Sequence, residues 1–173
     1  ALKRALSGRY ADAPDTVMIE ELGLGHGVAR IDLVVVNNYL HGYEIKSDLD
    51  TLNRLPEQAR IYNSVLDRIT LVVGYRHAYE AIKIVPEWWG VKIVEKGPLG
   101  GIRFFSCRMA RNNPSIDILS VANLLWRTEA MALLDEIASA DGVRSKARDV
   151  IYEELIKVAD LESIRSRVRR QFR

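Results

Sequence analysis

The stretch Ala29–Lys46, ARIDLVVVNNYLHGYEIK, determines how this chain is organised. Two apolar runs, Ile31–Val36 and Tyr39–Ile45, lie on either side of the dipeptide Asn37-Asn38, which tolerates left-handed turn conformations. Apolar runs joined by such a short polar turn are typical of a β-hairpin. The stretch therefore predicts two paired strands.

Three charged residues, Asp32, Glu44 and Lys46, interrupt or end these apolar runs. Charges within buried strands are costly unless they pair or bind something. Glu44 and Lys46 are two positions apart and project from one face of a strand. Asp32 joins that face only if the register places it alongside, because a slip of one residue reverses the faces. The set predicts a site for a divalent metal and a phosphate; the alternative is a strand-edge salt bridge between Lys46 and Glu44 or Asp32.

The length of 173 residues predicts one domain, with or without a small appendage, and 48% apolar residues allow a real core. No run approaches the ~18 apolar residues of a membrane span, and the start shows no signal-peptide pattern. The first residue is Ala rather than Met, which indicates a trimmed or partial sequence. The single cysteine, Cys107, excludes an intramolecular disulfide and fits a reducing compartment. We expect a cytoplasmic protein without a membrane partner.

The first strand candidate carries two acidic residues, Glu20 and Glu21. The register of the glycine turn after it decides which of them lies near Asp32. The pattern of apolar residues predicts a series of elements up to Cys107: a helix over Leu2–Tyr10, strands over Thr16–Leu22 and Ile69–Gly74, helices from Leu55 and over Arg76–Val85, and strands over Val91–Val94 and Ile102–Cys107.

Gln58 and Tyr62 lie four positions apart on the helix that begins near Leu55. This spacing puts them on one face, one turn apart. Because the helix follows the strand that ends at Lys46, Gln58 can reach the same site. The alternative is an exposed glutamine and a tyrosine at the edge of the core.

After Cys107 the apolar spacing becomes helical. Asn113-Pro114 predicts the start of a helix whose apolar stripe runs from Ile118 to Ile137, and Ser145 and Asp160 are predicted caps of two more helices. We therefore expect an α/β domain over residues 1–107 and a helical extension over 108–173. Five arginines fall in the last nine residues and either contact phosphates or form a solvated helix face: Arg165, Arg167, Arg169, Arg170 and Arg173.

The arrangement resembles the PD-(D/E)XK nuclease superfamily, in the branch with a RecB-type Gln-x-x-x-Tyr motif. The resemblance is carried by Asp32, by EIK at Glu44–Lys46 and by QARIY at Gln58–Tyr62. The wider stretch is similar to a group of small, largely uncharacterised bacterial and phage proteins in that superfamily. The chain departs from the pattern at its first helix, which lacks the acidic residue often found there. Glu21, or else Glu20, would have to supply it.

The resemblance implies a restriction-endonuclease-like αβββαβ core and a metal-dependent phosphodiesterase. Asp32, Glu44, the carbonyl of Ile45 and Glu21 would hold Mg²⁺ or Mn²⁺, which prefer oxygen ligands. Lys46 would orient the attacking water or stabilise charge in the transition state. Gln58 and Tyr62 would position substrate or water.

Three functions follow as hypotheses. The first is a nuclease acting on nucleic acid, DNA more than RNA, in repair, phage or mobile-element biology, with Arg165, Arg169 and Arg170 as weaker phosphate contacts. The second is a catalytically silent nucleic-acid-binding module. The third is an interaction protein that dimerises or binds a protein partner through the C-terminal helices.

Overall fold

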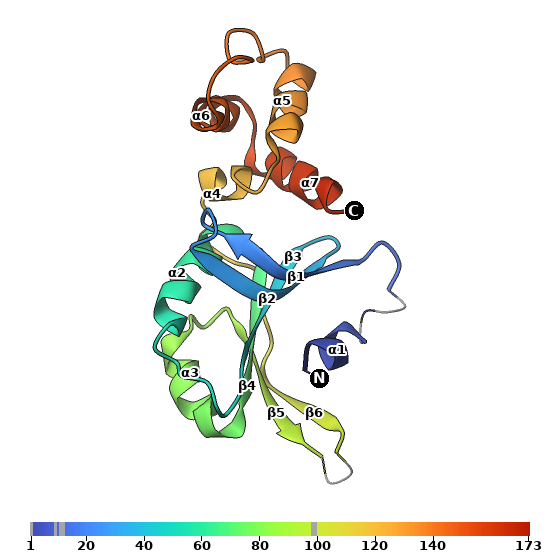
Figure 1. Cartoon of the computed structure of the whole chain (residues 1–173), viewed down its shortest axis with the longest axis vertical. Helices are drawn as coiled ribbons and strands as arrows, with labels where there is room; N and C mark the ends of the chain where they lie inside the picture. Colours follow the sequence, from blue (N-terminus) through green and yellow to red (C-terminus); the bar gives the residue numbers. More distant parts are fainter. Residues whose placement is uncertain (1, 9, 11–12, 98–99) are drawn as a thin grey trace.

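A six-stranded mixed sheet forms the centre of the protein, and its strand order follows the chain order (Figure 1). The computed structural model describes residues 2–8, 10, 13–97 and 100–173. Strands β3, β4 and β5 are parallel, and the other neighbouring pairs are antiparallel. The predicted α/β class and mixed sheet are confirmed. The strands are β1 (Val17–Leu24), β2 (Ala29–Val36), β3 (Leu40–Lys46), β4 (Arg68–Gly74), β5 (Gly90–Lys96) and β6 (Ile102–Arg108).

The predicted hairpin is present, with β2 and β3 paired from Val36 opposite Leu40 onward. The turn differs from the expectation, because neither Asn37 nor Asn38 has a positive φ. Instead, the Asn37 side chain accepts a hydrogen bond from the backbone N–H of Tyr39 at 3.1 Å. A side chain that replaces a backbone partner in this way closes a tight turn without left-handed residues.

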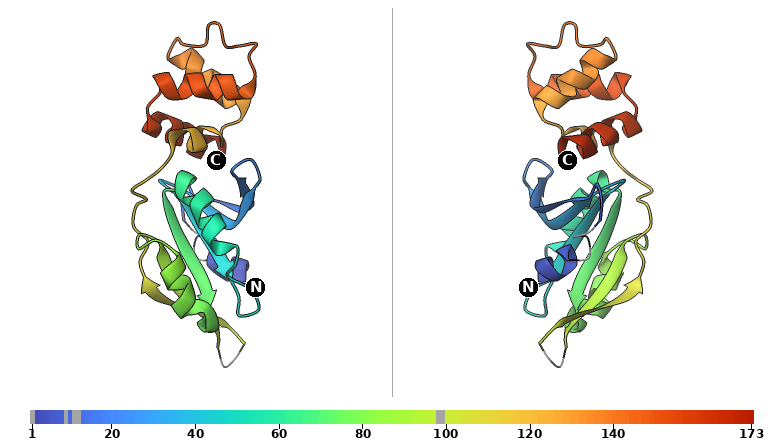
Figure 2. Two further views of the ribbon diagram at one scale, coloured as in Figure 1. Left: turned by 90° about the vertical axis from the view of Figure 1, so that its left-hand side faces the viewer. Right: turned by 90° about the vertical axis from the view of Figure 1, so that its right-hand side faces the viewer.

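Helices cover the two faces of the sheet unequally (Figures 1 and 2). One face carries α2 (Leu55–Val65) and α3 (Ala78–Ile84), with a 3₁₀ turn η1 (Tyr75–His77) before α3. The other face carries α1 (Leu2–Ser7), whose Leu6 packs in a small second core with residues of β2, β3 and β4. β4 is buried beyond its first residue, which explains its uninterrupted apolar sequence.

Four helices lie beyond one end of the sheet (Figure 2): α4 (Ile118–Ala122), α5 (Arg127–Glu136), α6 (Arg148–Val158) and α7 (Leu161–Gln171). The larger apolar core runs without interruption from α2 into these helices. Ile164 and Val168 of α7 are fully buried in it. The C-terminal helices were offered as a partner surface, but the apolar side of α7 at these two residues belongs to the chain's own core. None of the described helices has the length and apolar character needed to cross a membrane.

The continuous helical stripe expected from Ile118 to Ile137 is wrong, because the helix breaks between α4 and α5. The carbonyls left without helical partners at the break accept hydrogen bonds from α6: Arg148 donates to the carbonyls of Asn123 and Leu125, each at 3.0 Å. Trp126 is consequently 61% exposed rather than inward. Tertiary hydrogen bonds replace the helical ones at this point.

Two of the three predicted caps are also wrong. Asn113 does not begin a helix; its amide donates to the carbonyls of Asn63 and Leu66 at the end of α2, at 2.7 and 2.8 Å. Asp117 caps α4 instead. Ser145 does not cap α6 either, because that helix begins after Ala147, which has no capping side chain. Asp160 caps α7 as predicted.

His41 lies on the α1 side of β3 and shares a hydrogen bond with Thr70, its Nε2 at 2.8 Å from Oγ1. Burial, together with the positive charges of Arg68 and Lys92, lowers the pKa of His41 to about 4. Its neutral form is therefore the one that the folded protein stabilises.

We expect this imidazole to make stability depend on pH. A histidine with a lowered pKa stabilises the fold above its unfolded pKa of about 6.5, and the contribution is lost as the pH falls toward 4. Urea unfolding at pH 7 and pH 4.5 should show that His41→Gln loses less stability on acidification than the unchanged protein, by roughly 1–3 kcal/mol. Equal losses in the two proteins would contradict the assignment.

Candidate active site

An ion pair between Glu44 and Lys46 forms the centre of the site, at the end of β3. The Lys46 Nζ lies 2.7 Å from the Glu44 Oε1, and the two side chains share the face covered by α2, as the sequence predicts. Only 2% of Glu44 is exposed. A charge buried to this extent needs strong partners.

Gln58 and Tyr62 of α2 complete the shell around Glu44. The Gln58 amide donates to the Glu44 Oε1 at 2.9 Å, and its carbonyl accepts from the Lys46 Nζ at 3.0 Å. The Tyr62 hydroxyl lies 2.9 Å from the Glu44 Oε2. Since Gln58 is 7% exposed and Tyr62 fully buried, the alternative of an exposed glutamine and a core-edge tyrosine is wrong. The helical spacing delivers both groups to one carboxylate.

The electrostatics of Glu44 combine opposing influences. Burial raises the pKa of its carboxyl, Lys46 opposes that change, and the negative charge of Asp32 adds to it. Burial and the charge of Glu44 also raise the pKa of Tyr62, so its hydroxyl keeps its proton. The Tyr62 hydroxyl therefore remains available as a donor to the Glu44 carboxylate.

Asp32 approaches from β2 at the point where β2 and β3 part. The last paired residues are Leu33 and Tyr43, and one step beyond them the Asp32 Oδ2 accepts from the backbone N–H of Ile45 at 2.7 Å. Its side chain is one quarter exposed. The structure thus brings Asp32 alongside the Glu44–Lys46 pair and leaves its side chain partly exposed.

Lys3 is a site residue that the sequence did not reveal. Its Nζ pairs with Glu21 and lies 3.8 Å from the Asp32 Oδ1. Glu21 has a positive φ of 55° and a side chain that is 47% exposed, whereas Glu20 pairs across the sheet with Leu33. Of the two candidates, Glu21 is therefore the one joined to Asp32, through a cation. The first helix lacks the expected acid and supplies a lysine instead, for which no spacing in the sequence gave a signal.

The donor set is compatible with a hard cation, although no described group of three His, Cys, Asp or Glu side chains is placed to hold one. Mg²⁺ is commonly bound through one or two carboxylates and keeps several waters. Asp32 and Glu44, with the carbonyl of Ile45, supply oxygen donors of that kind. Lysines already lie against both carboxylates, which shows that the site attracts positive charge.

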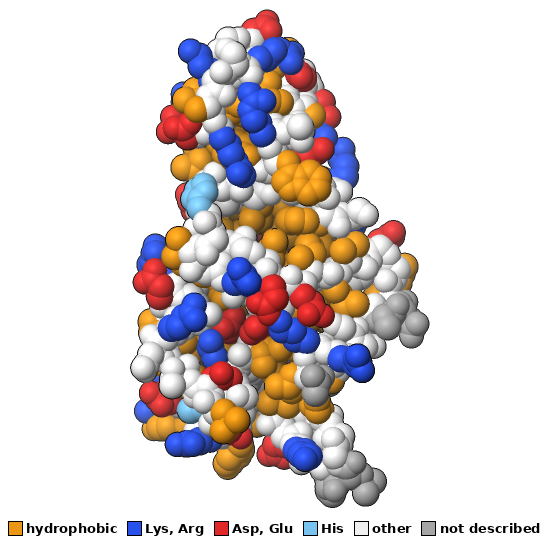
Figure 3. Space-filling view, in the orientation of Figure 1, with side chains coloured by type: hydrophobic (Ala, Val, Ile, Leu, Met, Phe, Trp, Pro, Cys, Tyr) orange, Lys and Arg blue, Asp and Glu red, His pale blue; other side chains and the backbone are white. Residues whose placement is uncertain are grey.

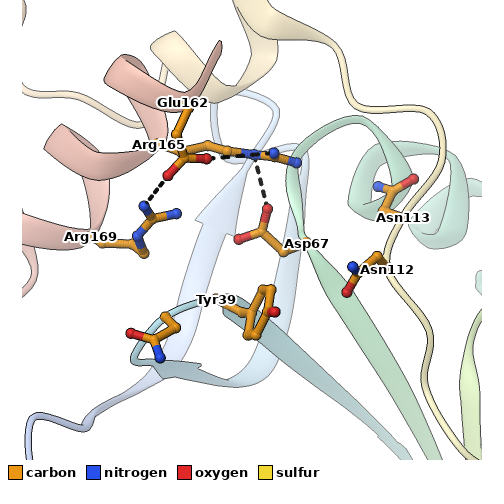
Figure 4. A pocket seen from close by; sticks show the side chains of 8 residues that line it. Tyr39, Asp67, Asn112, Asn113, Glu162, Arg165 and Arg169 are labelled. Carbon is orange, nitrogen blue, oxygen red and sulfur yellow. Dashed lines mark hydrogen bonds and ion pairs between the residues drawn. The ribbon is translucent and has the colours of Figure 1, made fainter.

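Two of the C-terminal arginines, Arg165 and Arg169, line a pocket of about 420 Å³ at the opposite end of β3 (Figure 4). Arg165 pairs with Asp67, Nε to Oδ1 at 3.0 Å, and Arg169 pairs with Glu162. Arg170 lines a neighbouring pocket. The Arg165–Asp67 pair joins α7 to the residue just before β4, whereas the Arg169–Glu162 pair lies within α7. Since carboxylates occupy both arginines, a phosphate would have to displace Asp67 or Glu162.

We expect Arg165→Ala to destabilise the fold. Asp67 is 5% exposed, its pKa is raised by burial, and it would lose its close cation. Breaking a buried pair from one side costs roughly 3–5 kcal/mol, reduced here because the arginine is partly exposed. Urea unfolding should show a loss of about 2 kcal/mol, and Arg60→Ala, at an exposed pair on α2, should lose under ~1 kcal/mol. Equal losses in the two variants would contradict the structural role.

Basic and acidic side chains alternate on the face seen in Figure 3, with apolar side chains gathered beside them. No continuous basic surface covers that face among the residues drawn. A nucleic acid bound there would rely on discrete sites rather than on a broad positive surface.

Comparisons with known proteins relate the chain to a family named after a phage protein. Residues 2–173 match the family described as Bacteriophage P4 protein cII. Protein cII of Enterobacteria phage P4 is 33% identical over 95 residues, which cover 48% of this chain and 36% of that protein. The match therefore spans about a third of the relative's length. No solved structure matches the chain.

Proposed function

The chain belongs to the bacteriophage P4 protein cII family, and on the geometry of its site we propose that it is a metal-dependent nuclease that hydrolyses phosphodiester bonds in DNA. Family membership leaves the reaction open. The observation that carries the proposal is the convergence of Asp32, Glu44 and Lys46 where β2 and β3 part, with Gln58 and Tyr62 on the helix above. We assign the αβββαβ part to the restriction-endonuclease-like fold on the same grounds.

Asp32, Glu44 and the carbonyl of Ile45 would hold Mg²⁺ or Mn²⁺, and Glu21 lies near enough to orient that shell through Lys3. Such a cation lowers the pKa of a bound water and neutralises charge on a phosphate. The Lys46 ammonium, held by Gln58 and Glu44, orients the nucleophile or stabilises developing charge. Tyr62 and Gln58 fix the Glu44 carboxylate and so limit its reorganisation during the reaction.

A cleavage panel tests the proposal. Single-stranded, duplex and branched DNA, and the corresponding RNA, are incubated with Mg²⁺, Mn²⁺ or EDTA. We expect metal-dependent cutting that is lost in Asp32→Asn and retained in Glu57→Gln, an exposed control on α2.

A folded protein that cuts nothing and binds no metal would overturn the nuclease proposal. The catalytically silent binding module would then take its place, because the Lys46–Glu44 pair is also complete as a structural ion pair.

A further inference from the structure

A second pocket, of about 190 Å³, opens on the α1 side of the sheet, beside the first residues of β3 and β4. His41 and Tyr43 point into it. Successive side chains of a strand project to opposite faces, so Glu44 points away from this pocket. The pocket is therefore separate from the candidate active site.

Three cations line this pocket: Arg68 from β4, Lys92 from β5 and Arg108 from the end of β6. No Asp or Glu is found among the described residues of the lining. In the pocket beside α7, by contrast, Asp67 and Glu162 hold the arginines (Figure 4). The described lining of the α1-side pocket therefore carries three positive charges and no carboxylate.

Each of these cations donates a hydrogen bond to a neutral group. The Arg68 Nε donates to the Asn112 Oδ1 at 2.8 Å, and the Arg108 Nε donates to the carbonyl of Trp89 at 2.6 Å. The Lys92 Nζ donates to the Ser106 Oγ at 2.8 Å. A guanidinium carries several N–H donors in a fixed fork, so one bond orients the whole group. Cations positioned in this way lose little entropy when they bind an anion.

The remaining wall combines neutral polar side chains with three apolar residues, Leu6, Met109 and Ala110. The Thr70 hydroxyl is almost fully buried beside His41, whose lowered pKa keeps the ring neutral at pH 7. Tyr10 and Tyr43 meet through their hydroxyls at the side next to α1. This lining can surround an anion with hydrogen-bond donors from several directions.

We propose that this pocket binds a phosphomonoester, either the terminal phosphate of a nucleic-acid strand or the phosphate of a free nucleotide. Three fixed cations suit a ligand with two negative charges better than they suit a singly charged carboxylate. Each guanidinium can also donate two parallel hydrogen bonds to two oxygens of one phosphate. The volume is below the ~300 Å³ at which pockets for whole small molecules begin. A phosphoryl group and the first atoms attached to it fit this description.

Calorimetric titration in EDTA tests the proposal, because neither cleavage nor the metal site then contributes. The probes are inorganic phosphate, a nucleoside monophosphate, and one oligonucleotide with either a 5′-phosphate or a 5′-hydroxyl end. Lys92→Ala is compared with Lys96→Ala, which removes the same charge from an exposed position on the same strand. Circular dichroism and thermal unfolding confirm that both variants fold.

We expect at least one phosphomonoester to bind, with a roughly tenfold loss in Lys92→Ala and little change in Lys96→Ala. Tighter binding of the 5′-phosphate oligonucleotide than of its 5′-hydroxyl form identifies a strand end as the source. Binding of the nucleoside monophosphate alone identifies a free nucleotide. The absence of phosphomonoester binding, or equal losses in the two variants, would overturn the proposal whether or not the protein cuts DNA.

Discussion

Replacing Lys46 by alanine should reduce metal-dependent cleavage by roughly 10²–10³-fold and also weaken the fold. The catalytic loss follows from removing the ammonium that would act on the nucleophile or on developing charge. The structural loss follows because Glu44 is buried and would lose its close cation. Losing one partner of a buried pair costs about 3 kcal/mol. The 2.7 Å contact between Lys46 and Glu44 is the basis of this expected loss of stability.

The pH dependence separates the two effects of Lys46→Ala. Burial raises the pKa of Glu44, and the loss of Lys46 would raise it further. A raised carboxyl pKa makes the folded state bind its proton more tightly, so the deficit in stability should shrink as the pH falls from 7 toward 5. Urea unfolding at both pH values measures this change. A deficit independent of pH would show that the unpaired carboxylate is not its source.

Glu44→Gln should abolish metal-dependent cleavage while costing less stability than Lys46→Ala. The amide has the shape of the carboxylate but brings no charge to be desolvated, and its oxygen can still accept from Lys46 and Gln58 while its NH2 faces the Tyr62 hydroxyl. Its second position becomes a donor and an inferior ligand for Mg²⁺. Titration with Mn²⁺ and the cleavage assay together check the prediction.

The double variant Glu44→Gln with Lys46→Ala provides the control. If the two side chains stabilise the fold mainly through each other, the double variant should be more stable than Lys46→Ala alone. Retention of full cleavage by Glu44→Gln would remove Glu44 from the reaction and leave the ion pair as a purely structural feature.

Much of this site could be predicted because residue types and short spacings within single strands and one helix indicate it. Charges at fixed spacing in apolar strands are costly, and that cost singles out Asp32, Glu44 and Lys46 in the amino-acid sequence. The four-residue spacing placed Gln58 and Tyr62 on one face of a helix, and both reach Glu44. Whether these residues bind metal and cut DNA remains a prediction.

The sequence misleads where distant segments decide local structure. Lys3 reaches Asp32 only because α1 lies against the open face of the sheet, and no periodicity records that contact. Asn113, followed by proline, matches the pattern of a helix cap but instead bonds the carbonyls at the end of α2. Arg148 bonds a carbonyl at the end of α4, where the apolar spacing in the sequence predicts that the helix continues. The α1-side pocket collects its cations from three strands, so their proximity is absent from any one stretch of sequence.

The contacts that residues after the sheet make at the end of α2 also determine when the protein can complete its folding. The backbone N–H of Asn113 bonds the carbonyl of Asp67, that of Asp117 bonds the carbonyl of Ser64, and Arg165 pairs with Asp67. During synthesis the sheet and α2 emerge first, and α7 follows only after several seconds at ~5–20 residues per second. Throughout that interval the apolar surface later covered by Ile164 and Val168 faces solvent. A ribosome-bound chain at this stage should attract chaperones, and release of the last helix should end that exposure.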